Sequence, residues 1–227
     1  MKINDQRTLV ATADGSNTVF DARTGEHYHS RHGAIGESRH VFLEMGLQHF
    51  LDSNPTKSNV TLVEIGFGTG LNFLISAEYC DSKGVNLDYH GVEAYPLEFE
   101  IIAALGYNQY ITDELWNEFL KNYSQAFHAN VSLNKHSAFR VYPQTVLDFT
   151  PPKADVVYFD AFSATHQPEM WSEEVLQHVA GMMNPGGIFV TYSVTGSLKR
   201  RMQKLGFSIE KLPGAPGKRE MLRAVKV

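Results

Sequence analysis

A glycine-rich stretch between a predicted strand and a predicted helix constrains this chain more than any other feature. Residues 60–65 are mostly β-branched or apolar, which is typical of a buried parallel strand, and they carry one acid, Glu64. Gly66, Gly68 and Gly70 follow at alternate positions, and a helix is expected from Leu71. A strand, a tight glycine turn and a helix N-terminus together predict a cradle for a ligand with a nucleoside or phosphate part.

The spacing of these glycines narrows the choice of ligand. Dinucleotide-binding folds favour Gly-x-Gly-x-x-Gly, whereas this chain has Gly-x-Gly-x-Gly, which resembles the S-adenosylmethionine motif of class I methyltransferases. A second predicted strand, residues 86–92, leads to Glu93 about 20 residues beyond the glycines, where a carboxylate can accept both ribose hydroxyls. An ordinary strand-to-helix turn and a surface acid are the plain alternatives.

A third predicted strand also ends in an acid. Residues 154–159 are apolar except for Asp155, and Asp160 follows them. Ligands of open α/β sheets lie at the carboxyl ends of the strands, so we expect Glu64, Glu93 and Asp160 to surround one crevice.

Length and composition favour a single α/β core. The chain has 227 residues, 43% of them hydrophobic, and its only cysteine is Cys80, which fits a reducing compartment. No signal peptide and no apolar run of membrane-spanning length is evident, so we expect a cytoplasmic protein. We expect a β unit and a helix over residues 1–52, packed on a core domain over residues 53–227.

Charge is distributed unevenly along the chain. The net charge is −5, yet residues 197–227 hold nine Lys or Arg and two acids, a net of +7. This asymmetry predicts a basic face on an acidic body, and a solvated lysine-rich surface is the alternative. The histidine-dense residues 27–32 are interpreted as a polar loop, with no metal site, because nothing fixes convergent ligands.

Other segments predict the rest of the fold. Strands are expected over residues 8–13, 18–22, 131–135, 139–142 and 188–192, and a closing antiparallel pair over 207–212 and 221–226. Helices are expected over residues 37–51, 96–105, 171–183 and 197–205, and a further helix is expected to begin at residue 112. Residues 185–187 are expected to end the helix over residues 171–183.

Six motifs in order carry a family resemblance. They are Glu37-Ser38, residues 66–74, Asp160-Ala161-Phe162-Ser163, residues 168–172, Lys199-Arg200-Arg201 and residues 217–222. Together they resemble the methyltransferase domain of MnmC, the bifunctional bacterial tRNA 5-methylaminomethyl-2-thiouridine enzyme, and its stand-alone relatives.

This resemblance implies a Rossmann-like class I methyltransferase with a mostly parallel seven-stranded sheet and a C-terminal antiparallel strand pair. It implies methyl transfer from S-adenosylmethionine to the amine of 5-aminomethyl(-2-thio)uridine at the tRNA wobble position. We expect no FAD-dependent oxidase half in this chain, and we expect a separate activity to supply the amine. The usual acid near the adenine is absent, and Gln144 or Asp148 is the expected substitute; Ala164 replaces a common proline.

The expected site follows from the residues and the resemblance together. Asp160 is the expected catalytic residue, which orients the amine or takes its proton. The expected cofactor-binding residues are Glu64, Gly66, Gly68, Thr69, Gly70, Asn72, Glu93, Gln144 and Asp160. The expected substrate-binding residues are Phe162 and Tyr192, which would stack on the uracil, and Lys199, Arg200, Arg201, Lys218 and Arg219, which would contact phosphates.

Three alternatives remain open on the sequence. An aminopropyltransferase would need further acids for a polyamine, and the basic C-terminal segment argues against it. An NAD-dependent oxidoreductase is disfavoured by the glycine spacing. A non-catalytic RNA-binding module is disfavoured by Asp160 beside an intact glycine loop. The sequence does not reveal the oligomeric state.

Overall fold

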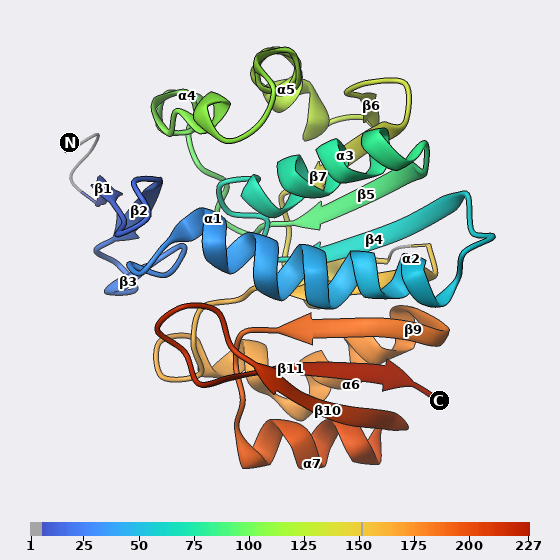
Figure 1. The fold of residues 1–227 in the computed structure, drawn as a ribbon. Coiled ribbons are helices and arrows are strands. Elements are labelled where there is room, and N and C mark those ends of the chain that lie inside the picture. Colours follow the sequence, from blue (N-terminus) through green and yellow to red (C-terminus); the bar gives the residue numbers. More distant parts are fainter. Residues whose placement is uncertain (1–5, 151) are drawn as a thin grey trace.

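A computed structural model describes residues 6–150 and 152–227. The main sheet has eight strands in the order β10-β11-β9-β8-β4-β5-β7-β6 (Figure 1). Its strands are β4 (Asn59–Ile65), β5 (Asn86–Val92), β6 (Val131–Ser132), β7 (Ser137–Tyr142), β8 (Ala154–Phe159), β9 (Met183–Thr191), β10 (Phe207–Pro213) and β11 (Glu220–Lys226).

The pairing within this sheet confirms the predicted fold class. Strands β7, β5, β4, β8 and β9 run parallel, and β11 pairs antiparallel with both β9 and β10. The family resemblance implied seven strands. The eighth is β6, which lies within the strand expected over residues 131–135 and pairs antiparallel with β7. A separate sheet of β1 (Arg7–Ala11), β2 (Asn17–Asp21) and β3 (Glu26–His27) forms the small N-terminal extension.

Helices cover both faces of the main sheet. One face carries the continuous helix made of α1 (Ala34–Glu37), the π-helical η1 (Ser38–Gln48) and α2 (His49–Ser53), together with α3 (Leu71–Lys83) and α5 (Asp113–Ala126). The other face carries α6 (Glu173–Met182) and α7 (Gly196–Lys204). Short helices complete the chain: α4 (Phe99–Ala104), η2 (Tyr107–Gln109), η3 (Val146–Asp148) and η4 (Pro168–Trp171).

Strand residues alternate between two apolar cores, which is why the central strands are apolar throughout. In β4, Leu62 belongs to the core under the first helical layer, and Val63 belongs to the core under α6 and α7. In β8, Tyr158 likewise belongs to the first of these cores and Phe159 to the second. A chain with two such cores must place its polar ligand contacts at the strand ends.

One predicted boundary is wrong. The sequence favoured a break at residues 185–187 before the next strand, but β9 begins at Met183, directly after α6. Met183 pairs with Ala154 across the sheet, and an irregularity in the ladder follows before regular pairing resumes at Ile188. Residues 184–187 form this irregularity, and Gly186 within it has φ of +77°, so the predicted glycine break lies inside the strand as a bulge and not before it.

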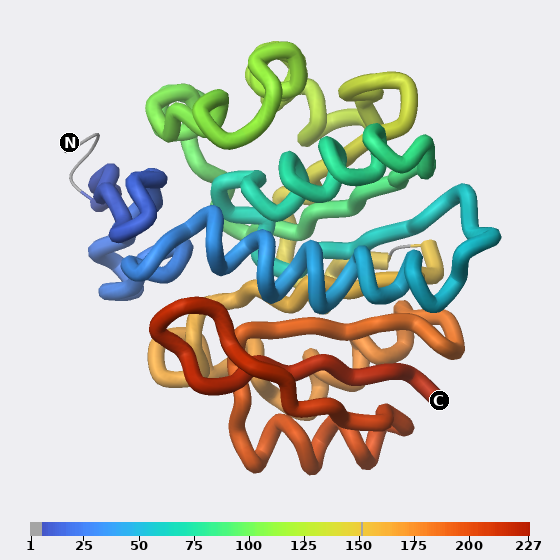
Figure 2. Tube along the Cα trace, viewed as in Figure 1, coloured from blue at the N-terminus to red at the C-terminus, as the bar shows by residue number. Residues whose placement is uncertain are grey.

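The carboxyl ends of the parallel strands all face the same side of the molecule, where the small N-terminal sheet and the loop between β10 and β11 also lie (Figure 1; Figure 2). No helix in the described residues is both long and apolar enough to span a membrane.

Candidate active site

The glycine loop follows β4 and passes between two neighbouring strand ends. The Gly66 amide donates to Val92 O at 2.9 Å, and the Asp160 amide donates to Ile65 O at 2.9 Å. A Cβ on Gly66 would lie 2.5 Å from Asp160 O, and φ is +90° there, so this position requires glycine. The loop is thereby held directly against the end of β8.

Asn72, in the first turn of α3, connects the first and third predicted acids. Its Nδ2 donates to Glu64 Oε1 at 2.7 Å and to Asp160 Oδ2 at 2.9 Å. The Tyr89 hydroxyl donates to the other oxygen of Glu64 at 2.6 Å. Burial raises the pKa of Glu64 well above its ordinary value. Burial, and then the charge of Glu37, raise the pKa of Asp160 in the same direction.

Glu93, the second predicted acid, lies on the other side of the glycine loop. Its Oε2 accepts from the Gly68 amide at 3.0 Å and its Oε1 from the Tyr95 amide at 3.0 Å. Burial raises the pKa of this carboxyl as well. The Glu93 amide donates to Tyr142 O, which brings the segment containing Gln144 to the same edge; Gln144 and Asp148 follow β7 there.

Thr69 is tied to the N-terminal extension. Its Oγ1 lies 2.7 Å from His29 Nε2, and it accepts from the Tyr107 hydroxyl at 3.2 Å. Burial lowers the pKa of His29 to about 4, so this ring is neutral at pH 7. The side chain of Tyr28 lies over the loop, since a Cβ on Gly68 would meet its ring at 2.8 Å. No local pattern in the sequence indicated that residues before the main sheet reach the glycine loop.

A cavity of about 200 Å³ lies beside Asp160. Its walls come from the end of β8, from β9, from residues 26–31 and from the loop before β11. The lining includes Glu26, Tyr28, His29, Glu37, Asp160, Phe162, Tyr192 and Lys218. Four of these were expected near a substrate, namely Asp160, Phe162, Tyr192 and Lys218, but the N-terminal half of the wall was not. In that half, the sequence had marked Glu37 only as part of a family motif and residues 27–32 only as a polar loop.

The two aromatic residues expected to stack on a base have partners in the structure. The Phe162 ring packs edge-on against Tyr28, with centroids 5.1 Å apart. The Tyr192 hydroxyl donates to Ala161 O at 2.9 Å, and Lys218 Nζ lies 3.8 Å from the centre of the Tyr192 ring. One face of Tyr192 is therefore covered by a cation.

The five expected phosphate contacts divide into two groups. Arg201 donates to Trp171 O, and Lys218 Nζ donates to Glu37 Oε1 at 2.8 Å, so both have protein partners. Arg200 and Arg219 are exposed, and Lys199 is half-buried on α7. The latter three leave their charges available at the protein surface.

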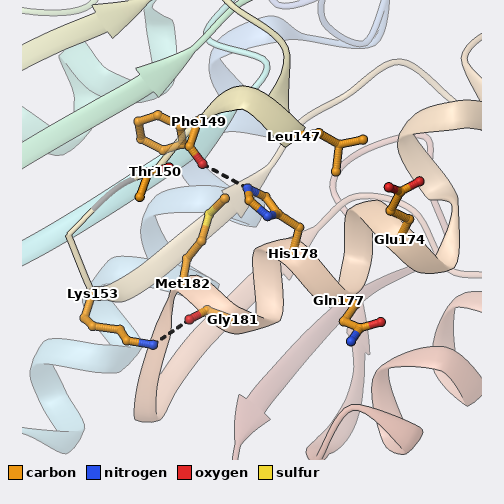
Figure 3. Close-up of a pocket in the computed structure, with 9 residues that line it drawn as sticks. All are labelled: Leu147, Phe149, Thr150, Lys153, Glu174, Gln177, His178, Gly181 and Met182. Carbon is orange, nitrogen blue, oxygen red and sulfur yellow. Dashed lines mark hydrogen bonds between the residues drawn. The ribbon is translucent and has the colours of Figure 1, made fainter.

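A second, larger hollow of about 690 Å³ lies away from these acids, between the segment after β7 and helix α6 (Figure 3). His178 Nε2 lies 2.9 Å from Phe149 O, and Lys153 Nζ donates to Gly181 O at 2.6 Å. Its polar side chains thus bind backbone carbonyls of its own walls. Among the described residues, no group of three or more His, Cys, Asp or Glu is arranged to hold a metal ion.

The site fits S-adenosylmethionine, a ligand with two positive charges and a ribose. Asn72 Oδ1 is buried and has no hydrogen-bond partner among the residues that the structure describes, so it can accept from an ammonium. Three acids with raised pKa surround the loop, and a cationic ligand would stabilise their ionised forms. Glu93 stands at a strand end, where it can accept from ribose hydroxyls.

Comparison with known proteins also indicates that the chain binds S-adenosylmethionine. A family model described as S-adenosyl-L-methionine-dependent methyltransferase matches residues 109–227. The chain is similar to the tRNA 5-methylaminomethyl-2-thiouridine biosynthesis bifunctional protein MnmC of Methylobacillus flagellatus, with 31% identity over 221 residues. It is also similar to MnmC of Campylobacter hominis, with 30% identity over 213 residues.

These alignments cover 89% and 91% of this chain but 33% and 31% of the relatives, so the chain spans about a third of their length. A solved structure of MnmC2 from Aquifex aeolicus has the same fold, with a TM-score of 0.78 at 22% identity, over 98% of this chain and 71% of that one. Because the family model matches more than half of the chain, this protein belongs to the S-adenosyl-L-methionine-dependent methyltransferases that the model describes.

Proposed function

We propose that this methyltransferase acts on tRNA and methylates the primary amine of 5-aminomethyl(-2-thio)uridine at the wobble position. The similarity to the MnmC proteins, which extends over about nine-tenths of this chain, carries the proposal. A small cavity beside the half-buried carboxylate of Asp160, with Lys218 in its lining, supports a modified base as the acceptor. The proposal places the protein in the cytoplasm, with residues 53–227 as the catalytic domain and residues 1–52 packed on it.

Bound S-adenosylmethionine supplies an electrophilic methyl group on a sulfonium. The residues of this chain have to hold the acceptor amine close to it and aligned. An alkyl ammonium has a pKa near 10.4 in water, so its nitrogen must lose a proton before it can attack. In the proposal Asp160 accepts a hydrogen bond from the amine and takes or relays that proton, while Asn72 fixes the orientation of its carboxylate.

The proposed cofactor contacts follow the geometry of the loop. Gly66, Gly68 and Gly70 let the backbone approach the ligand, Glu93 accepts from the ribose, and Asn72 and Asp160 face the amino-acid part. Gln144 lies at the adenine end in this assignment. Phe162 and Tyr192 border the base, and Lys199, Arg200 and Arg219 contact phosphates.

The test supplies two tRNAs separately with labelled S-adenosylmethionine and follows the wobble nucleoside by mass spectrometry. Label is expected in 5-aminomethyl tRNA and not in carboxymethylaminomethyl tRNA. The longer side chain would bring a second carboxylate beside Asp160, Glu26 and Glu37, where like charges repel in a partly desolvated cavity. Label in the carboxymethylaminomethyl tRNA, or in neither tRNA, would contradict the proposed acceptor.

A further inference from the structure

The cavity beside Asp160 already holds a primary ammonium group, that of Lys218. This residue lies in the loop between β10 and β11, and its Nζ donates to Glu37 Oε1 at 2.8 Å. The same nitrogen lies 3.8 Å from the centre of the Tyr192 ring. A carboxylate and an aromatic face are the two groups by which proteins bind ammonium ions.

Both receiving groups are fixed by contacts that do not involve Lys218. Glu37 is only 5% exposed, and its second oxygen accepts from the Ser30 amide at 2.8 Å. The Tyr192 hydroxyl is held by Ala161 O. Lys218 itself is a third exposed and extends from a loop. The binding position formed by Glu37 and the Tyr192 ring is therefore held in place by the rest of the protein. The ammonium group that occupies it is carried by a long flexible side chain.

This binding position is also close to Asp160, the candidate catalytic carboxylate. Glu37, Tyr192, Lys218 and Asp160 line the same cavity of about 200 Å³. Besides burial, the charge of Glu37 raises the pKa of Asp160, and the charge of Lys218 opposes that effect. Each carboxylate has one oxygen bound within the protein, that of Asp160 by Asn72 and that of Glu37 by the Ser30 amide, and the other Glu37 oxygen binds the ammonium.

We propose that Glu37 and Tyr192 form the binding subsite for the acceptor amine, and that Lys218 occupies it in the free protein as a mimic of the substrate. The aminomethyl group of the proposed acceptor is also a primary alkyl ammonium, so it can take the same two contacts. Lys218 is then released toward the RNA, where its charge can contact a phosphate. This inference rests on the proposed function, because it assumes an amine as the acceptor.

The test uses n-butylamine, a small primary amine, and needs no tRNA. Binding to the full chain is measured by thermal shift and by titration at pH 7 for the wild type, Lys218→Ala, Lys218→Ala with Glu37→Gln, and Lys211→Ala. Lys211 is the matched control, since it pairs with Glu220 outside the cavity. A tethered group competes at an effective concentration on the order of millimolar or above. Its removal should therefore lower the half-saturating concentration of amine at least about tenfold.

The expected result is stronger amine binding by Lys218→Ala alone, which Glu37→Gln abolishes, while Lys211→Ala behaves as the wild type. Equal binding by Lys218→Ala and wild type, or binding that survives Glu37→Gln, would overturn the subsite. Should Lys218→Ala not fold, Lys218→Ser serves in its place with the same two outcomes.

A kinetic measurement separates this inference from the proposed function. Glu37→Gln should raise KM for 5-aminomethyl tRNA at least about tenfold and leave the affinity for S-adenosylmethionine unchanged. Wild-type protein that methylates no tRNA would contradict the proposed function, whereas active wild type with an unchanged KM in Glu37→Gln would contradict the subsite alone.

Discussion

At the scale of single residues, the candidate site depends on one buried acid, Glu64, and one half-buried acid, Asp160. Asn72 donates from one nitrogen to Glu64 and to Asp160, so the amide holds both carboxylates in place. Each of these acids has a raised pKa because burial disfavours its charge. A bound cation reverses that preference, which explains why acids are tolerated where the apolar strands end.

Asp160→Asn should keep the affinity for S-adenosylmethionine within a few-fold and reduce turnover by about 10²-fold or more, because an amide cannot accept the amine's proton. Titration calorimetry and single-turnover methylation measure the two effects. Asn retains the shape of the side chain and its contact with Asn72. Turnover close to that of the wild type would remove Asp160 from the mechanism.

At the scale of elements, the glycine loop is bounded by backbone on one side and by the N-terminal extension on the other. Gly68 has φ of +51°, and its amide donates to Glu93, while the Tyr28 ring covers it. The segment that follows the small N-terminal sheet is thus packed against the glycine loop.

Gly68→Ala should weaken S-adenosylmethionine binding at least about tenfold, because a Cβ there would meet the Tyr28 ring at 2.8 Å and displace the loop. Gly84→Ala is the matched control. Its φ of +66° imposes a similar backbone cost of about 1–2 kcal/mol, but nothing lies within 4 Å of its Cβ. Thermal unfolding should show that both variants are destabilised. Calorimetry should show weaker S-adenosylmethionine binding only in Gly68→Ala. Equal affinities in the two would mean that the loop tolerates the added methyl group.

Helix α7 and the loop before β11 carry the exposed basic residues Arg200 and Arg219. Arg200→Glu combined with Arg219→Glu should weaken tRNA binding and make its salt dependence shallower, by about one unit of slope for each phosphate that the variant no longer neutralises. S-adenosylmethionine should bind as before. Lys121→Glu is the control, since Lys121 is an exposed lysine on α5, away from α7 (Figure 1). A slope equal to that of the control would place the RNA on another face.

At the scale of the whole molecule, ion pairs and shared packing join the N-terminal sheet to the main body. Arg7 is buried and contacts Asp21 at 3.3 Å and Glu98 at 2.7 Å, and Val19 belongs to the main apolar core. We therefore expect the two parts to unfold in one cooperative transition.

The pH dependence of that transition tests the role of Asp21 in this junction. Burial alone would raise the pKa of Asp21, but hydrogen bonds from Arg23 and Arg7 lower it from 3.8 to about 2. An acid with a depressed folded-state pKa stabilises the protein above its unfolded pKa and loses that effect as the pH falls. We expect about 2 kcal/mol of unfolding free energy to be lost between pH 4 and pH 2, measured by urea denaturation. Asp21→Asn should remove this loss of unfolding free energy between pH 4 and pH 2. A variant whose unfolding free energy depends on pH as in the wild type would contradict the role of Asp21.

The sequence by itself determined the elements whose residues interact with near neighbours. The apolar run of β4, the alternate glycines and the acids after three strands depend on local backbone preference and on burial on both faces, and these appear in the order of residues. The fold class and the carboxyl-end location of Glu64, Glu93 and Asp160 followed from them.

Tertiary structure alone brought the two halves of the wall of the cavity beside Asp160 together. Glu37 and Lys218 are 181 positions apart in the chain, and His29 reaches Thr69 from a different sheet. Contacts of this kind depend on how packed layers bring distant loops together, which leaves no periodic trace in the sequence. The start of β9 at Met183 has the same origin, because Met183 pairs with Ala154 on the neighbouring strand while residues 185–187 form an irregularity in the ladder.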